Sequence, residues 1–231
     1  EHRNLLGGNE TARISATAAL FEQELRATFT KPQFLRAEQT LLAGAAIRQQ
    51  DDDAFNEVAF RTSVNIERVA NARLRYSVGL SVEAADISGS NRDGKSLLVG
   101  LPLAATYDAS DALLDPSSGY RLRAGLTTYA GTFDGAKVAF PVVDVHGAAY
   151  WPLGEHVLAI RSRIGSIIGI ERDDVPPPQR LYSGGGGSVR GYESRAIGPL
   201  DGQLEPLGGR CVVELGFEVR LRLSRQFGLV P

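Results

Sequence analysis

The side chains best suited to chemistry lie in one glycine-rich segment, residues 173–201. Four consecutive glycines occupy residues 184–187, and after Ser188 come Val189, Arg190, Gly191 and Tyr192. Glycine adopts positive φ angles and lets the backbone pass close to other backbone. A guanidinium drawn out of bulk water needs a fixed acceptor, and a carboxylate matches its planar fork of donors best. We therefore expect the segment to carry Arg190 to an acidic partner.

Other chemistry is a weaker interpretation of these residues. The four glycines lack a following Gly-Lys-Ser/Thr and a helix, both of which a phosphate-binding loop requires. Ser188 has no G-x-S-x-G frame and no histidine placed to serve it. The run at residues 51–53 lacks the spacing of a calcium loop, and a solvated acidic turn explains it better. The sequence predicts no enzymatic activity, metal or cofactor.

Composition narrows the class of protein. The chain has 231 residues, 43% of them hydrophobic and 23% charged, with a net charge of −2. This balance argues against a nucleic-acid partner, which requires a clustered basic face. Cys211 is the only cysteine, so an internal disulfide is impossible. No apolar run approaches the roughly 18 residues of a membrane-spanning helix.

The elements that position the segment have a period of two, which is typical of strands. From Arg73 to Glu83, polar and small side chains alternate with Leu74, Tyr76, Val78, Leu80 and Val82. The pattern is clearest late in the chain. There Glu214, Gly216, Glu218, Arg220 and Arg222 alternate with Val213, Leu215, Phe217, Val219, Leu221 and Leu223. We expect the even-numbered set to face a polar interior and the odd-numbered set to face lipid.

The alternation predicts about ten strands, most of them long enough to cross a bilayer at a tilt. Their predicted ranges are 10–20, 22–31, 39–49, 57–67, 71–84, 97–107, 119–130, 138–151, 155–169 and 211–223. Residues 85–96 and 170–210 are predicted to be long external loops, opposite short periplasmic turns. Residues 108–118 break this rule as a long turn on the periplasmic side. We expect loop 170–210 to fold inward, because Val189 and Tyr192 beside Arg190 would otherwise be exposed to water.

Two all-β architectures fit this periodicity. In a transmembrane barrel the charged face lines a wet lumen, whereas one arginine facing lipid at mid-membrane costs about 2–4 kcal/mol. In a soluble antiparallel sandwich the charged face meets water and the apolar face forms a core. The lengths of the predicted strands favour the barrel, since ordinary strands average about 5–6 residues.

The loop motif resembles one family. Val189-Arg190-Gly191-Tyr192 is similar to the VRG(F/Y) motif in the sixth external loop of the BamA/TamA superfamily, also called the bacterial surface antigen barrels. The approach through residues 175–177, 180–182 and 184–185 is closest to the TamA branch. The Asp115-Pro116-Ser117-Ser118-Gly119-Tyr120 turn resembles the D-P-x-x-G-Y turn of that superfamily. The resemblance covers essentially the whole chain.

The resemblance implies a sixteen-stranded barrel in the outer membrane of a Gram-negative bacterium. The chain then corresponds to strands three to twelve, without the periplasmic POTRA domains, the first two strands or the last four. Family members pair the loop arginine with an inward carboxylate. The main partner, an Asp in an F-x-D-x-G stretch, would lie beyond Pro231. Glu218 is the matching inward glutamate within this chain, and Glu214 is the second candidate.

The function that the resemblance implies is assembly. Such barrels insert or export β-barrel and autotransporter clients without nucleotide chemistry, since an unpaired strand edge can template an incoming strand. The implied partners are outer-membrane lipid, unfolded clients and a TamB-like periplasmic protein anchored in the inner membrane. The alternatives are a two-partner-secretion exporter, a passive outer-membrane pore, or a soluble β-sandwich binding module.

Overall fold

The described residues form one antiparallel sheet of twelve strands in strict sequence order. The computed structural model describes residues 2–4, 7–89, 92–222 and 228–229, without the side chains of Arg222 and Leu229. Ten strands are long: β2 (Thr11–Ala18), β3 (Glu22–Pro32), β4 (Gln39–Asp52), β5 (Phe55–Val69), β6 (Leu74–Ser88), β7 (Gly94–Asp108), β8 (Gly119–Phe133), β9 (Ala136–Leu153), β10 (His156–Ile167) and β11 (Cys211–Arg222). Two short strands, β1 (His2–Arg3) and β12 (Gly228–Leu229), pair with β2 and β11.

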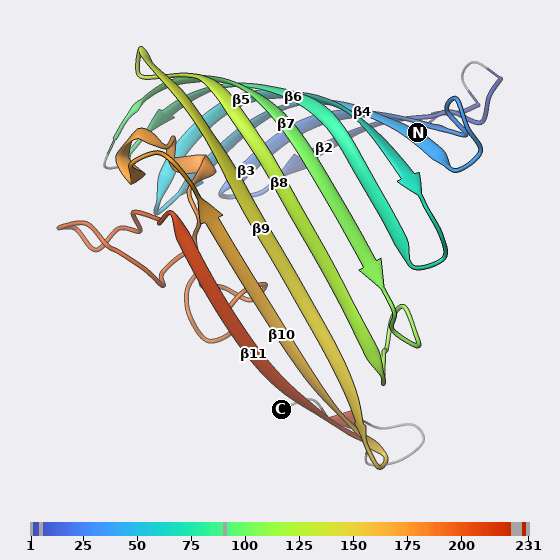
Figure 1. Ribbon diagram of the computed structural model, residues 1–231. Coiled ribbons are helices and arrows are strands. Elements are labelled where there is room, and N and C mark those ends of the chain that lie inside the picture. The colour runs from blue at the N-terminus through green and yellow to red at the C-terminus, as the bar shows by residue number, and fades with distance from the viewer. Residues whose placement is uncertain (1, 5–6, 90–91, 223–227, 230–231) are drawn as a thin grey trace.

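The sheet is curved and open (Figure 1). Its ten long strands run from 8 residues in β2 to 18 residues in β9, and every consecutive pair is antiparallel. Long tilted strands of this kind are those of a membrane barrel wall rather than of a small sandwich. The segment between β10 and β11 lies on the inner side of the curve. None of the helices in the described part of the chain is long and apolar enough to span a membrane.

The two faces of the sheet differ as the alternation predicts. On β7 the outward side chains Leu97 and Leu101 are 52% and 54% exposed, whereas Leu98, which points inward, is completely buried. On β11 the odd-numbered Val213, Leu215, Phe217 and Val219 are exposed and the even-numbered Glu214, Glu218 and Arg220 are shielded. The side chains of Arg222 and Leu223, for which the same alternation was predicted, lie outside the described part of the structure.

The predicted contrast in loop lengths holds for the long connection from β10 to β11 and for the short turns at the opposite end, but it is wrong for residues 85–96. Residues 85–96 are not a long loop, because β6 continues to Ser88 and β7 begins at Gly94. Residues 53–54 and 134–135 are tight turns at the same end of the sheet as the connection from β10 to β11. Asp134 and Gly135 have φ angles of 48° and 76°, which suit a two-residue hairpin. The irregular connection 109–118, at the opposite end, is long as predicted.

Candidate functional site

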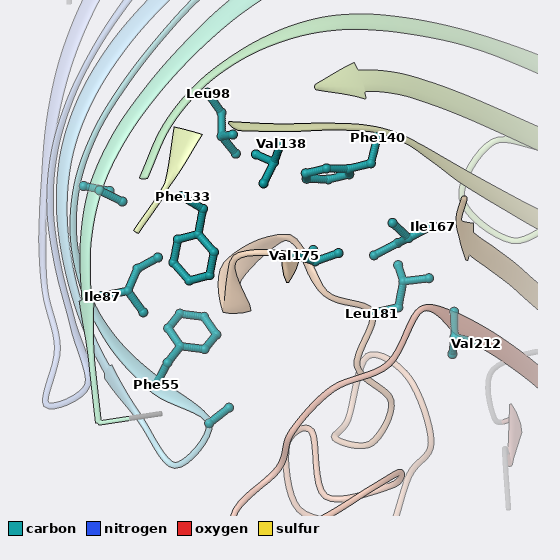
Figure 2. Close-up of a cluster of buried hydrophobic side chains, with 13 residues drawn as sticks. Phe55, Ile87, Leu98, Phe133, Val138, Phe140, Ile167, Val175, Leu181 and Val212 are labelled. Atoms are coloured by element: carbon teal, nitrogen blue, oxygen red, sulfur yellow. The ribbon is translucent and has the colours of Figure 1, made fainter. Parts of the chain in front are cut away.

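The connection from β10 to β11 begins with an apolar segment that packs against the inner face of the sheet. It contains two short 3₁₀ helices, η1 (Arg172–Asp174) and η2 (Pro177–Gln179). Val175, between them, is completely buried. Figure 2 shows Val175 in the middle of a cluster that joins this segment to the inward side chains of the strands. The cluster comprises Ala54, Phe55, Ala59, Ala85, Ile87, Leu98, Phe133, Val138, Phe140, Ile167, Val175, Leu181 and Val212.

Arg180 and Tyr182 hold the base of this connection together. The buried guanidinium of Arg180 donates to the carbonyl oxygens of Val175 and Leu207, at 3.0 Å each, and burial lowers its pKa. The hydroxyl of Tyr182 donates to the Pro177 carbonyl at 3.1 Å, and burial raises the pKa of Tyr182 to about 12. Leu181 and Gly209 exchange two backbone hydrogen bonds of 2.9 and 2.8 Å. These contacts close residues 181–209 into a loop and fix its base. We call residues 175–182, which form this base, the neck.

Polar contacts tie the connection to strands far away in the sequence. Gln179 Nε2 donates to Glu83 Oε1 of β6 at 2.5 Å, and Arg61 of β5 holds the other oxygen of Glu83 at 2.6 Å. Arg195 lies 3.4 Å from the carboxylate of Asp52, with its guanidinium over the rings of Phe55 and Tyr182 at 4.8 and 5.0 Å. The connection therefore crosses the inner side of the sheet from β10 to β4 and β6.

The four glycines have different roles. Gly184 and Gly185 have φ angles of 112° and 95°, and a Cβ atom on Gly184 would lie 2.5 Å from the carbonyl oxygen of Glu193. A Cβ atom on Gly186 or Gly187 would meet no atom within 4 Å. Only the first two positions thus require glycine for the backbone path.

The tip of the loop lies beside the carboxylates of β11. Arg190 Nη2 is 3.6 Å from Glu218 Oε2, and Arg220 Nε is 2.8 Å from Glu218 Oε1. Ser188 Oγ donates to Glu214 Oε1 at 2.5 Å and accepts from the backbone N–H of Gly184 at 3.1 Å. The structure thus brings Arg190 next to Glu218, while Glu214 binds Ser188 instead.

The other two motif residues differ from each other. Val189 is half-buried, and Gly191 has a φ angle of 86° that favours glycine. Tyr192 is 60% exposed, so the expectation that inward folding shields this ring is wrong. Its neighbours in the loop are turns and bends rather than strand residues, so no period of two predicts which side of the chain the ring occupies.

Sequence reasoning missed part of the site. Arg163 of β10 lies 2.8 Å from Asp144 of β9 and 3.6 Å from Glu214, and it donates to the Tyr182 carbonyl at 3.2 Å. His146 also contacts Asp144. The inward parity of these residues was predictable, but their pairing with the loop depends on the curvature of the sheet. In the described ranges, no three His, Cys, Asp or Glu side chains gather as a metal site requires.

A cavity of about 520 Å³ lies between the loop tip, residues 187–190, and the inner faces of β8 to β11. Among the described residues, five arginines line it but only two carboxylates, those of Glu214 and Glu218. The arginines are Arg121, Arg123, Arg161, Arg163 and Arg190. The arrangement offers ion pairing and polar binding.

Comparison with known proteins gives three findings. The family model described as the Omp85 superfamily domain matches residues 4–231. The chain is 26% identical, over 211 residues, to the outer membrane protein assembly factor BamA of Nitratidesulfovibrio vulgaris (strain Hildenborough), covering 86% of this chain and 26% of that protein. The crystal structure of BamA from Haemophilus ducreyi lacking POTRA domains 1–3 superposes with a TM-score of 0.82 at 16% identity, over 96% of this chain and 49% of that one. The chain thus spans about a quarter of the curated relative.

Proposed function

The chain belongs to the Omp85 superfamily and forms part of an outer-membrane β-barrel, and from that premise we propose that the protein acts as an outer-membrane protein assembly factor. In this proposal it binds unfolded β-barrel clients and helps them to insert into the outer membrane. It does so without chemical catalysis, using strand pairing and a polar interior. The similarity to a protein named as an outer membrane protein assembly factor supports the proposal.

The observation that carries the proposal is the loop on the inner side of the wall. Val175 is buried under the strands, Gln179 binds Glu83, and Arg190 lies beside Glu218. A passive pore requires a clear lumen, whereas this connection fills the concave side with an apolar cluster and several polar contacts. The filled interior therefore favours an assembly factor, or a gated exporter, over an open channel.

The finer assignment rests on the loop sequence. We propose that the protein serves autotransporter clients and works with a TamB-like periplasmic partner, because residues 175–177 and 180–182 resemble the TamA branch. Those residues form the buried neck of the loop, with Val175 and Arg180 both shielded from water. Co-purification of the full-length protein with an inner-membrane-anchored partner tests this assignment, and repeated recovery without one would contradict it.

The experiment for the proposed function is client insertion into liposomes. The full-length protein is reconstituted, an unfolded outer-membrane barrel is added, and its folding is followed by the shift in gel mobility of unheated samples. We expect faster folding than in empty liposomes. An unchanged folding rate, together with rapid leakage of a small dye from the loaded liposomes, would instead indicate a pore.

A further inference from the structure

The cavity at the loop tip has more positive than negative charge. Four of its five arginines lie on β8 and β10, and the strand register places them in two adjacent rows of the inner face. One row runs Arg123, His146, Arg163, Glu214 across β8 to β11, and the next runs Arg121, Ala148, Arg161, Gly216. Directly opposite side chains on neighbouring strands lie about 4.5–5.5 Å apart at Cβ. The cationic groups are therefore concentrated on one patch of the wall.

Most of the nearby carboxylates are already engaged. Arg163 binds Asp144, Arg121 lies 3.0 Å from Asp108, and Glu218 is shared by Arg190 and Arg220. Arg123 and Arg161, by contrast, form no ion pair with any described residue, although both line the cavity. Two guanidiniums thus face a hollow of about 520 Å³ with their donors available. A volume between roughly 300 and 1,000 Å³ is typical of ligand sites.

We propose that Arg123 and Arg161 form a binding site for acidic side chains of an unfolded client polypeptide. This inference rests on the proposed function and names the chemistry that the inner wall would recognise. A carboxylate matches the fork of an arginine, and two such forks from β8 and β10 can hold one acidic group or two neighbouring ones. Gly186 and Gly187 leave open space beside the loop tip for a passing chain.

The position of the cavity favours a polypeptide over a lipid. The arginine and glutamate side chains of the lining project from the concave face, on which the loop lies, whereas apolar side chains suited to acyl chains, such as Leu97 and Val213, project from the opposite face. A lipid phosphate would have to leave the membrane surface to reach Arg123 or Arg161. A client segment that passes along the inner wall would meet both residues directly.

The test is binding of a fluorescent oligoglutamate peptide to the full-length protein in detergent, with oligoglutamine of the same length as the neutral probe. We expect the acidic peptide to bind more tightly and to lose affinity as salt is raised. Arg123→Gln combined with Arg161→Gln should weaken binding by about tenfold or more. Since neither arginine forms an ion pair within the described part of the chain, the folded barrel should persist, as checked by gel mobility of unheated samples.

Arg75→Gln is the matched control. Arg75 lies on the same inner face of β6, in the same cross-strand row as Arg123, and is outside the cavity. Its replacement should change binding by less than about twofold. Arg123→Glu with Arg161→Glu should reverse the preference towards an oligolysine peptide, a result that mere loosening of the barrel would not produce.

Three outcomes would overturn the inference: equal binding of both probes, no effect of the Arg123→Gln, Arg161→Gln pair, or displacement of the peptide by glycerol phosphate at lower concentration than by glutamate. The last result would assign the site to a lipid phosphate. The proposed function fails differently, because the protein would then not accelerate client insertion in liposomes. Normal insertion with no selective peptide binding would reject only the acidic site.

Discussion

Arg190 shares the carboxylate of Glu218 with Arg220, and it holds the weaker position. The Arg190 Nη2–Glu218 Oε2 distance is 3.6 Å, against 2.8 Å between Arg220 Nε and Glu218 Oε1. The side chain of Arg190 is 61% exposed, whereas that of Glu218 is 15% exposed. Arg220 in turn reaches Asp115 at 3.2 Å, in the connection at the far end of the sheet. Glu218 thus joins the loop tip to a chain of contacts along the inner wall.

This relationship predicts a small but measurable coupling. Arg190→Ala should cost about 0.2–1 kcal/mol of unfolding free energy, the range of exposed ion pairs. Glu218→Ala should cost more, since it also deprives Arg220 of its nearest acceptor. The double variant should be less destabilised than the sum, as measured by urea unfolding of the full-length protein. The destabilisations by Arg75→Ala and Glu218→Ala should be additive. If those of Arg190→Ala and Glu218→Ala are additive as well, Arg190 and Glu218 do not interact.

The same variant separates folding from function. Arg190→Ala should leave the strands formed, because no backbone hydrogen bond of the sheet depends on it, but it should loosen the loop tip. We expect the rate of client insertion in liposomes to fall more than the amount of folded protein. Equal losses in both would mean that Arg190 serves folding alone.

Two neighbouring glycines provide a matched pair. Gly184→Ala places a Cβ atom 2.5 Å from the Glu193 carbonyl at a φ of 112°, so it should strain the loop by about 1–3 kcal/mol. Gly186→Ala meets no atom within 4 Å and should change little. Limited proteolysis of the folded protein reads this out as faster cleavage of residues 184–196 in the first variant. Similar cleavage of the two variants would show that Gly184 does not lie against the Glu193 carbonyl in the folded loop.

The apolar neck should carry much of the loop's stability. Val175→Ala removes two methyl groups from a completely buried position and should destabilise by about 1–2 kcal/mol. Val213→Ala makes the same change at a side chain that is 76% exposed on the outer face. In detergent the second variant should unfold at nearly the wild-type urea midpoint. A Val175→Ala midpoint equal to that of Val213→Ala would place the neck in solvent.

Alkaline pH should loosen the neck through Tyr182. Burial raises the pKa of this phenol from its ordinary value of 10.0 to about 12. As pH rises, Tyr182 therefore loses its proton at a lower pH when the neck is unfolded than when it is folded. The stability that the neutral phenol contributes is complete below pH 10 and declines between pH 10 and 12. Protease cleavage of the neck should rise in that window. Tyr182→Phe, which lacks the titrating group, should show a smaller rise, and an identical rise would exclude Tyr182 as its cause.

Strands were predictable where their two faces differ. Alternation fixes which side chains of β11 point inward, because a register shift of one residue would move every polar side chain from the inner face to the lipid-facing one. The prediction failed at residues 85–96, where Ala85 and Ile87 point inward and are buried under the loop. The inner positions there are apolar and the outer positions Asp86 and Ser88 are polar, so the period of two persists with its polarity reversed. The strand ends could not be found without knowing that the loop covers them.

The pairing of the loop motif with β11 was predictable, but the contacts of the loop with more distant strands were not. Arg190 and Glu218 were identified together through the resemblance of the loop motif to the BamA/TamA superfamily, and alternation independently placed Glu218 on the inner face. Gln179 and Glu83 are separated by 96 residues and meet only because the sheet curves. Neither residue type marks a contact of this kind in advance. Arg163 could not be singled out from the sequence either, because many arginines of the wall share its inward-facing position in the alternation.

The most direct test of the account is cross-linking of the loop to the far wall inside the folded protein. Gln179→Cys and Glu83→Cys are combined in a Cys211→Ser background, because these two side chains meet at 2.5 Å. A short cross-linker with two thiol-reactive alkylating groups should join them and change the gel mobility of the denatured chain, while Gln179→Cys with Arg75→Cys should remain unlinked. If instead Gln179→Cys reacts freely with a bulky external thiol reagent and forms no cross-link to Glu83→Cys, the loop does not lie on the inner wall.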